Sequence, residues 1–336
     1  MTQQEINRLL ATSPSGSGAQ LIATHASWVL LIGDYAYKIK RPVRYSFLDY
    51  TTLALRKAAC EAEVRLNRRL TDIYLDVAPV VRTADGRIRI GGPDGEIIDY
   101  AVRMVRVDPD RQMDVLLDRG AVTTGEVRML AARIAAFHQA ADISYEPYDQ
   151  ARLLADFADL ETAAAPLAAG IPGVDTRIRA WTGLVEQAIP PLAARFRERV
   201  AAGFVRDGHG DLHCRNIFLL ASPVIFDCIE FSEHFRINDV LSEIAFLAMD
   251  LDLHGRPDLT AVLLDSYQAV YPCLLVPADR IILTYFQLYR AGVRLKIAGL
   301  RLAAVPAAER AATVTEAQRL ADLCDTYARS LAKPTA

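Results

Sequence analysis

Two neighbouring segments of the chain place two aspartates and an asparagine at a fixed spacing. The first, residues 209–216, reads His-Gly-Asp-Leu-His-Cys-Arg-Asn, which separates Asp211 from Asn216 by five positions. The second, residues 224–230, reads Val-Ile-Phe-Asp-Cys-Ile-Glu, with Asp227 at the end of an apolar run. A short apolar run that ends in a carboxylate is typical of a buried strand with a ligand at its end. We therefore expect a loop followed by a strand.

This spacing is the one used for phosphoryl transfer from ATP. Protein kinases carry H-R-D-x-x-x-x-N followed by D-F-G, and the first Asp orients the attacking hydroxyl and accepts its proton. The Asn and the second Asp hold magnesium against the phosphates. The pattern predicts Asp211 as the base and Asn216 and Asp227 as the magnesium ligands. Gly210 stands where kinases have Arg.

Two other interpretations use the same residues. The alternation His209-x-Asp211-x-His213 would put three side chains on one face of a strand, as in a metal-dependent hydrolase. The segment could also be only a polar turn between a helix and a strand. The kinase interpretation is preferred because neither alternative explains Asn216 or the Asp-x-x-Glu sequence that follows.

On these segments the chain resembles the aminoglycoside phosphotransferase (choline kinase-like) family, whose pattern is H-G-D-x-x-x-x-N followed by a hydrophobic-Asp segment. The resemblance is closest to a bacterial subgroup in which this module is often fused to a second P-loop kinase. Residues 24–31 resemble its T-H-x-S-x-V-F-L stretch, and residues 37–43 resemble Y-K-x-K-x-P-V. The H-G-D-L-H and F-D-C-I-E-F stretches match as well, and the similarity runs from about residue 20 to about residue 300.

The resemblance implies an enzyme that uses ATP and Mg²⁺ to phosphorylate a hydroxyl of a small molecule, such as a sugar, an amino sugar or an aminoglycoside. It also implies a separate P-loop kinase as a possible partner. The identity of the acceptor stays open. A nucleotide-binding pseudokinase without transfer is the competing interpretation, and the intact set of Asp211, Asn216 and Asp227 argues against it.

Composition narrows the class of protein further. A net charge of −3 gives no argument for binding nucleic acid or an anionic membrane. Five cysteines without paired spacing predict reduced thiols in a cytoplasm. No stretch reaches the roughly 20 apolar residues of a transmembrane helix, and no signal peptide is visible. We therefore expect a cytoplasmic protein, with the oligomeric state left open.

The periodicity of apolar residues changes once along the chain. A helix is predicted over residues 2–11, a flexible loop over 13–18, and strands over 28–32 and 35–40 with a Gly33-Asp34 turn between them. The other early elements are a helix over 52–70 and strands near 78–82, 87–90 and 97–107. After residue 108 the pattern is mostly helical. This order predicts an α+β, protein-kinase-like two-lobed fold, with a small β-rich lobe over residues 1–105 and a larger helical lobe over 106–336.

The first lobe should supply a lysine for the ATP phosphates and a glutamate that pairs with it. Lys38 and Lys40 are two residues apart and therefore share a face of the predicted strand. Lys38 is preferred because it lies within the apolar run. On the following helix Glu63 is preferred over Glu61, because a buried stripe runs beside it. The alternative is that these residues are ordinary surface charges.

Further nucleotide contacts are expected from residues on either side of this strand. A glycine-rich phosphate loop is missing from the sequence at this place, where Thr24 and Ser27 stand instead. Their hydroxyls and backbone N–H groups could bind phosphate, or could simply form a turn. Met104, between the lobes, could pack on the adenine or belong to the core.

Two carboxylates after the second segment, Asp239 and Glu243, lie one helical turn apart, and we expect them to hold the loop around Asp211. His213 and Glu230 are candidates for contact with the acceptor. A loop-stabilising role is equally open for His213.

The acceptor itself has two candidate binding patches. Residues 249–254 are acidic and would suit a cationic acceptor. Arg290 and Arg294 lie one turn apart on a predicted helix and would suit an anionic group, since a guanidinium binds such groups in a bidentate manner. We expect the arginines to bind the acceptor, unless Asp250 or Asp252 pairs with them internally.

Overall fold

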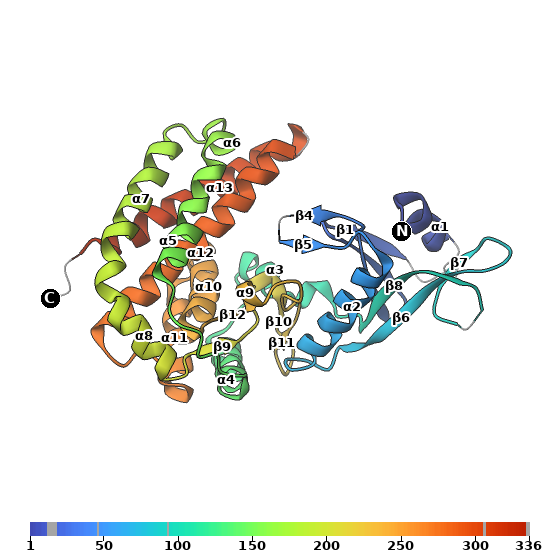
Figure 1. Ribbon diagram of the computed structural model, residues 1–336, viewed down its shortest axis with the longest axis horizontal. Helices are drawn as coiled ribbons and strands as arrows, with labels where there is room; N and C mark the ends of the chain where they lie inside the picture. Colours follow the sequence, from blue (N-terminus) through green and yellow to red (C-terminus); the bar gives the residue numbers. More distant parts are fainter. Residues whose placement is uncertain (12–18, 46, 93, 305–306, 334–336) are drawn as a thin grey trace. The chain divides into compact units, whose positions relative to one another are not determined.

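The computed structural model describes residues 1–11, 19–45, 47–92, 94–304 and 307–333 (Figure 1). The loop predicted over residues 13–18 lies outside the described residues. The chain divides into two compact units, Met1–Val115 with Asn216–Arg236, and Leu116–Arg215 with Ile237–Ala336. The predicted lobes, 1–105 and 106–336, differ from these units mainly in one segment. Residues 216–236 belong to the first unit, because their side chains make the ion pairs with its sheet that are described below.

The first unit is built on a six-stranded antiparallel sheet with the strand order β1-β2-β3-β8-β6-β7. Its strands are β1 (Gln20–Ala23), β2 (Ser27–Ile32), β3 (Tyr35–Lys40), β6 (Tyr74–Arg82), β7 (Ile88–Ile90) and β8 (Glu96–Val105). The turn between β2 and β3 uses Gly33 at a φ of 57°, a conformation that glycine adopts without strain. The strands predicted from the sequence are confirmed, whereas β1 was not predicted.

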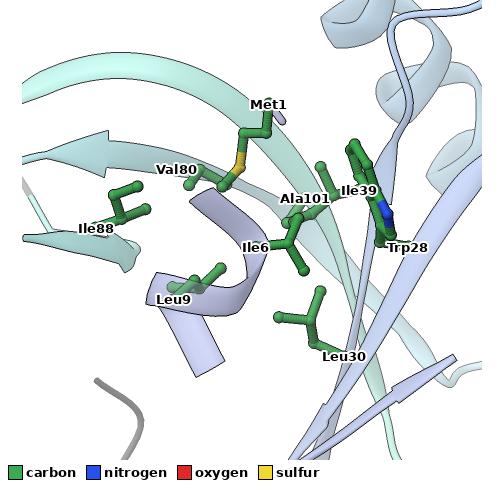
Figure 2. Close-up of a cluster of buried hydrophobic side chains, with 9 residues drawn as sticks. All are labelled: Met1, Ile6, Leu9, Trp28, Leu30, Ile39, Val80, Ile88 and Ala101. Carbon is green, nitrogen blue, oxygen red and sulfur yellow. The ribbon is translucent and has the colours of Figure 1, made fainter. Parts of the chain in front are cut away.

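A helix covers each face of this sheet. On one face, Ile6 and Leu9 of α1 (Gln3–Ala11) join a buried cluster that Figure 2 shows: Met1, Ile6, Leu9, Trp28, Leu30, Ile39, Val80, Ile88 and Ala101. On the other face, Cys60 and Val64 of α2 (Leu53–Asn67) pack against the sheet residues Ala36, Tyr74, Val102 and Met104. Side chains alternate along β3, so Lys38 and Lys40 lie on the side of Ala36, facing α2. The sheet therefore directs both lysines toward the helix that carries Glu63.

Residues 216–236 add a hairpin and a short helix to the first unit. Strands β10 (Ile217–Phe218) and β11 (Val224–Ile225) pair in antiparallel fashion, and α9 (Glu233–Arg236) follows them. A second small hairpin, β4 (Arg44–Tyr45) with β5 (Leu48–Asp49), precedes α2. The strand predicted before Asp227 is thus confirmed as β11.

The second unit is mainly helical, as predicted. The boundary in the chain between the two units falls within α3 (Met113–Asp118). The helices of the second unit are α4 (Thr124–Ala140), α5 (Gln150–Ala158), α6 (Ala164–Ala168), α7 (Val174–Ala188), α8 (Ala193–Ala201), α10 (Val240–Leu253), α11 (Pro257–Val270), α12 (Pro277–Ala304) and α13 (Ala307–Leu331). Helix α10 is buried almost throughout and packs against α11, α12 and α13.

A two-stranded ladder leads into the buried helix of this unit. Strands β9 (Val205–Asp207) and β12 (Ile237–Asp239) pair, and α10 begins directly after β12. The side chain of Asp239 accepts a hydrogen bond from the backbone N–H of Leu241, so it caps the helix. Because the pair is antiparallel, Val205 at the start of β9 lies opposite Asp239, and Asp207 at its end lies opposite Ile237. Among the described residues, no helix is both long and apolar enough to cross a membrane.

Candidate active site

The first unit holds a lysine between two carboxylates. Lys38 Nζ lies 2.9 Å from Glu63 Oε1 and 2.5 Å from Asp227 Oδ1. Glu63 is fully buried, whereas the expected alternative Glu61 is exposed and pairs with Lys57. Burial alone would lower the pKa of Lys38, but the charges of Asp227 and Glu63 hold that pKa well above its ordinary value. Lys38 therefore keeps its positive charge at neutral pH.

Lys40 joins the same cluster on its other side. Its Nζ lies 2.5 Å from Glu63 Oε2 and also pairs with Glu230. The hydroxyl of Tyr50 donates to Glu230 Oε1 at 2.5 Å. Glu230 is only 5% exposed and has these two internal partners, and its expected contact with an acceptor stays a prediction.

Asp227 has a backbone conformation that needs support. Its φ is 64°, and it is the one non-glycine residue of the described chain with a positive φ. Such a conformation costs about 1–3 kcal/mol and persists only where the surroundings impose it. The backbone N–H of Asp227 donates to the Tyr74 hydroxyl at 3.1 Å, and the next N–H, of Cys228, donates to Asn67 Oδ1 at 2.9 Å. These bonds hold the turn in place.

Asn216 and Asp227 lie at the same end of the β10–β11 hairpin. Ile217 pairs with Ile225, and the N–H of Phe226 donates to the carbonyl of Asn216 at 3.0 Å. The hairpin therefore brings an amide side chain and a carboxylate to one end. Amide and carboxylate oxygens are the ligands that Mg²⁺ prefers, so these residues fit the metal that the sequence pattern implies.

The second unit holds the loop of residues 208–215, called the Asp211 loop below. Helices α10 and α12 hold its backbone through three side chains. Glu243 Oε1 accepts from the N–H groups of His209, at 2.6 Å, and Gly210, at 2.5 Å. Arg290 donates to the carbonyl of Gly210 at 3.2 Å. At the far end, Asp250 Oδ2 accepts from the N–H of Cys214 at 2.9 Å.

The glycines of this loop are required by its shape. Gly210 has a φ of 86°, where a residue with a Cβ would be strained. A Cβ at Gly208 would overlap the carboxylate of Glu243. The replacement of the kinase Arg by Gly210 therefore follows from the local backbone conformation.

Glu243 is tied to a buried histidine behind the loop. His138 Nε2 lies 2.8 Å from Glu243 Oε2, and His138 Nδ1 lies 2.7 Å from the Tyr267 hydroxyl. Burial alone would raise the pKa of Glu243, but hydrogen bonding to His138 and to the backbone of Gly210 lowers it to about 2. The expectation that Glu243 holds the Asp211 loop is met. Asp239 instead caps α10 and pairs with Arg199 at 2.7 Å.

Removing this carboxylate should unfold the second unit more easily. We expect Glu243→Ala to lower the free energy of unfolding by about 3 kcal/mol, because His138 and two backbone N–H groups lose a buried partner. Glu243→Gln should cost less, since the amide oxygen can still accept those hydrogen bonds. Urea denaturation at pH 7 measures both, with Glu186→Ala on an exposed face of α7 as the control. A Glu243→Ala cost below about 1 kcal/mol would contradict this role.

The side chain of Asp211 pairs with a histidine of its own loop. Asp211 Oδ2 lies 3.2 Å from His213 Nε2, and the N–H of Arg215 lies 3.2 Å from His213 Nδ1, which orients the ring. Burial alone would raise the pKa of Asp211, but the charge and hydrogen bond of His213 hold it well below its usual range. Burial lowers the pKa of His213, and Asp211 outweighs this and raises it. Asp211 is therefore ionised at neutral pH.

The pairing predicts a measurable titration of His213. Because its folded pKa is raised, the pair contributes stability below pH about 6.5 that is lost as pH rises through the folded pKa. We expect the wild-type His213 ring to titrate above 6.5 by NMR. In Asp211→Asn its pKa should fall below that of the wild type, since burial remains and the charge of Asp211 is gone. An unchanged pKa in that variant would show that the pair does not form.

The expected anion-binding arginines have internal partners. Arg294 pairs with Asp250 Oδ1 at 2.8 Å and with Glu316 Oε1 at 3.2 Å. Arg290 is buried, bonds to the backbone carbonyl and hydroxyl of Ser242 and to the loop, and stacks on the Phe246 ring. Because a buried guanidinium needs several acceptors, the protein itself supplies them. The internal pairing with Asp250 that the sequence left open is thus present for Arg294, and binding of an anionic acceptor by the two arginines stays a prediction.

The acidic patch over residues 249–254 is also occupied internally. Asp250 is buried and serves Arg294 and the Asp211 loop. Asp252 accepts from the hydroxyls of Thr260, at 2.7 Å, and Tyr327, at 2.5 Å. Both carboxylates therefore have partners within the second unit.

The other residues expected to contact the nucleotide, Thr24, Ser27 and Met104, have contacts within the first unit. The Thr24 hydroxyl accepts from the N–H of Ser27 and donates to the Ser27 carbonyl, so these residues form the turn between β1 and β2. Ser27 is buried, and its contact with phosphate stays a prediction. Met104 packs in the core against α2, which is the alternative that the sequence left open.

The hydrolase alternative loses its geometric basis. Residues 209–213 form a loop rather than a strand, so the side chains of His209, Asp211 and His213 do not alternate on a sheet face. Nδ1 of His209 is turned to the backbone N–H of Asp211 at 3.2 Å. In the described parts of the chain, no group of three or more His, Cys, Asp or Glu side chains is arranged to hold a metal ion.

Sequence reasoning missed several residues that support these groups. Asn67 lies four positions after Glu63 on the buried side of α2, and this spacing was a usable signal. No comparable local pattern pointed to Tyr50, to Tyr74 or to the role of Arg290 in holding the Asp211 loop, because the partners of these residues are distant in the sequence.

Comparison with known proteins identifies the fold. A choline/ethanolamine kinase family protein from Mesorhizobium loti gives a TM-score of 0.55 at 13% identity, over 98% of this chain and 99% of the other. A thermostable mutant of an aminoglycoside phosphotransferase gives 0.54 at 12% identity, over 98% and 99%. An ethanolamine kinase of Plasmodium vivax gives 0.54 at 10% identity, over 97% and 87%. The chain has the fold of these kinases. The predicted α+β, protein-kinase-like fold is thereby confirmed.

Sequence comparison adds relatives without a described activity. No protein-family model matches the chain. An uncharacterized protein of Mycobacterium bovis and two of Mycobacterium tuberculosis are each 32% identical over 287 residues, which is 83% of this chain and 54% of each relative. The chain thus spans about half the length of the curated relatives it matches.

Proposed function

We propose that this chain is a small-molecule kinase of the aminoglycoside phosphotransferase and choline kinase type, which transfers the γ-phosphate of ATP to a hydroxyl group. The observation that carries this proposal is Lys38, held between the buried Glu63 and the partly exposed Asp227. Kinases use a lysine–glutamate pair of this kind to bind the ATP phosphates, together with an aspartate that binds magnesium. The kinase fold of the chain supports the same conclusion.

Each group of the first unit has a part in binding the nucleotide. Lys38 would contact the phosphates, with its ammonium oriented by Glu63. Asn216 and Asp227 would hold Mg²⁺, which when bound offsets the negative charge of the phosphate oxygens. Most of the rate would then come from positioning and charge neutralisation, because phosphoryl transfer needs little covalent chemistry from the protein.

In the second unit Asp211 would bind and orient the acceptor hydroxyl. Its lowered pKa keeps the carboxylate ionised, so that it can accept the hydrogen bond of the hydroxyl. A carboxylate with a low pKa is a weak base, so orientation is the larger part of its contribution and proton acceptance the smaller.

The test is a search for acceptor-dependent transfer. The protein is incubated with ATP and Mg²⁺ against a panel of sugars, amino sugars and aminoglycosides, and ADP release is followed. The proposal predicts a compound that stimulates ADP release and gains a phosphate by mass spectrometry, with no product in EDTA or in Asp211→Asn. Magnesium-dependent nucleotide binding without transfer to any compound of the panel would favour a pseudokinase.

The family resemblance suggests a partner to test. Because the chain resembles a module that is often fused to a P-loop kinase, we propose a separate P-loop kinase as that partner. Co-purification of the two proteins, with and without ATP, measures this directly.

A further inference from the structure

The two lysines of β3 contact two acids of one segment. Lys38 pairs with Asp227, and Lys40 pairs with Glu230, three residues later. Glu63 lies between them, with one carboxylate oxygen on each lysine. Alternate residues of a strand lie about 6.5–7 Å apart, so the segment after β11 is attached to the sheet at two separated points. Two such points fix the direction of the segment, which a single ion pair would leave free to pivot.

The three carboxylates that pair with these lysines differ in their exposure to solvent. The Asp227 side chain is 41% exposed, while Glu63 is 0% and Glu230 is 5% exposed. Asp227 alone of these acids is therefore open to a ligand from solvent. Lys40 is 2% exposed and already has two acidic partners, so its ammonium is directed to the protein rather than to a phosphate.

The contacts of Lys40, Glu230 and Tyr50 help to hold the backbone of Asp227 in its conformation. That residue adopts a positive φ, which the chain has to impose from outside. Tyr74 and Asn67 accept hydrogen bonds from the backbone N–H groups of Asp227 and Cys228, which holds the residues at the turn itself. The bonds from Lys40 and Tyr50 to Glu230 hold the chain just beyond it. A buried ion pair adds little net stability over apolar side chains of similar volume, which leaves positioning as its main effect.

We propose that Lys40, Glu230 and Tyr50 are positioning residues that fix the carboxylate of Asp227 for a divalent metal ion bound with the nucleotide. The inference rests on the proposed kinase function and adds residues that do not themselves touch the nucleotide. It predicts that losing this cluster weakens metal affinity before it weakens phosphate binding by Lys38. Losing the partner of an orienting group typically reduces metal affinity about 10–100-fold.

The test compares single, double and control variants. Lys40→Met, Glu230→Met, the double variant Lys40→Met/Glu230→Met and the mild Tyr50→Phe are titrated with a non-hydrolysable ATP analogue by calorimetry, over a range of Mg²⁺ concentrations. Thermal unfolding is measured in parallel. Arg56→Met is the matched control, because it breaks the buried pair with Asp99 in the same unit.

We expect each single methionine variant to need about 10–100-fold more Mg²⁺ for half-maximal nucleotide binding, with near-normal affinity at saturating Mg²⁺. Tyr50→Phe should show a smaller shift in the same direction without a large loss of stability. The double variant should recover most of the unfolding temperature lost in Lys40→Met, because Glu230 no longer remains as a buried carboxylate without a lysine. Its requirement for Mg²⁺ should stay high, which a purely structural role does not predict.

The outcomes separate the two proposals. If the wild type binds nucleotide with Mg²⁺, and the double variant or Tyr50→Phe shows the same Mg²⁺ dependence as the wild type, the positioning role is wrong and the kinase proposal stands. An equal shift in Arg56→Met would also overturn the positioning role, because general destabilisation would then explain it. If the wild type shows no Mg²⁺-dependent binding, both proposals fail.

Discussion

Replacing Asp211 with Asn is expected to abolish phosphoryl transfer and to leave nucleotide binding almost unchanged. The side chain keeps its shape but loses the charge that orients and deprotonates the acceptor hydroxyl. Losing this contribution costs about 10²–10⁴-fold in turnover. The backbone of the Asp211 loop should persist, because Glu243, Arg290 and Asp250 hold it without using the Asp211 carboxylate.

Steady-state turnover with the acceptor found in the panel measures the effect, and calorimetry measures nucleotide affinity. Asp258→Asn is a suitable control, since Asp258 is an exposed carboxylate of the same unit that pairs with Arg256. A variant that kept more than roughly a tenth of wild-type turnover would remove Asp211 from this role.

Local patterns were sufficient for the parts of the site that depend on short spacing. The alternation of a strand put Lys38 and Lys40 on one face, and the buried stripe of the next helix selected Glu63. Both inferences need only a few neighbouring residues, and the structure pairs both lysines with Glu63. The apolar run before Asp227 likewise predicted β11.

Partners that are distant in the chain could not be derived in this way. Glu230 is 190 positions from Lys40, and the sequence contains no local sign that they meet. The same holds for Arg290, whose partners on α10 and in the Asp211 loop decide whether it is free or buried. A helical spacing of two arginines describes a face of a helix, but packing decides what covers that face. The assignment of residues 216–236 to the first unit depends on such distant pairs as well.

The internal pairing of both charged patches changes where an acceptor site should be sought. Arg294 and Asp250 neutralise each other while holding the end of the Asp211 loop, so substituting either would disturb the loop before it changed specificity. These two patches therefore favour neither a cationic nor an anionic acceptor. A panel that includes cationic, neutral and anionic hydroxyl compounds follows from this pairing.

Replacing Asp227 with Asn is expected to remove magnesium-dependent nucleotide binding and to reduce turnover by at least about 100-fold, which corresponds to about 2.7 kcal/mol. Asparagine is the substitution of choice because it tolerates the positive φ of this position better than other residues do. Lys38 keeps its pair with Glu63 at 2.9 Å, so the variant leaves no buried ammonium without a carboxylate. The loss can therefore be assigned to the metal-binding charge rather than to unfolding.

Calorimetric titration with the non-hydrolysable ATP analogue, in Mg²⁺ and in EDTA, distinguishes Asp227 from Lys38. For Asp227→Asn the affinity in Mg²⁺ should fall to the value in EDTA, because the ligand charge for the metal is gone. For Lys38→Met the affinity should fall in both conditions, because the phosphates lose an ammonium whether or not a metal is present. Equal affinities of Asp227→Asn and the wild type in Mg²⁺ would show that this carboxylate does not bind the metal. The partly exposed position of Asp227 would then be a feature of the turn alone.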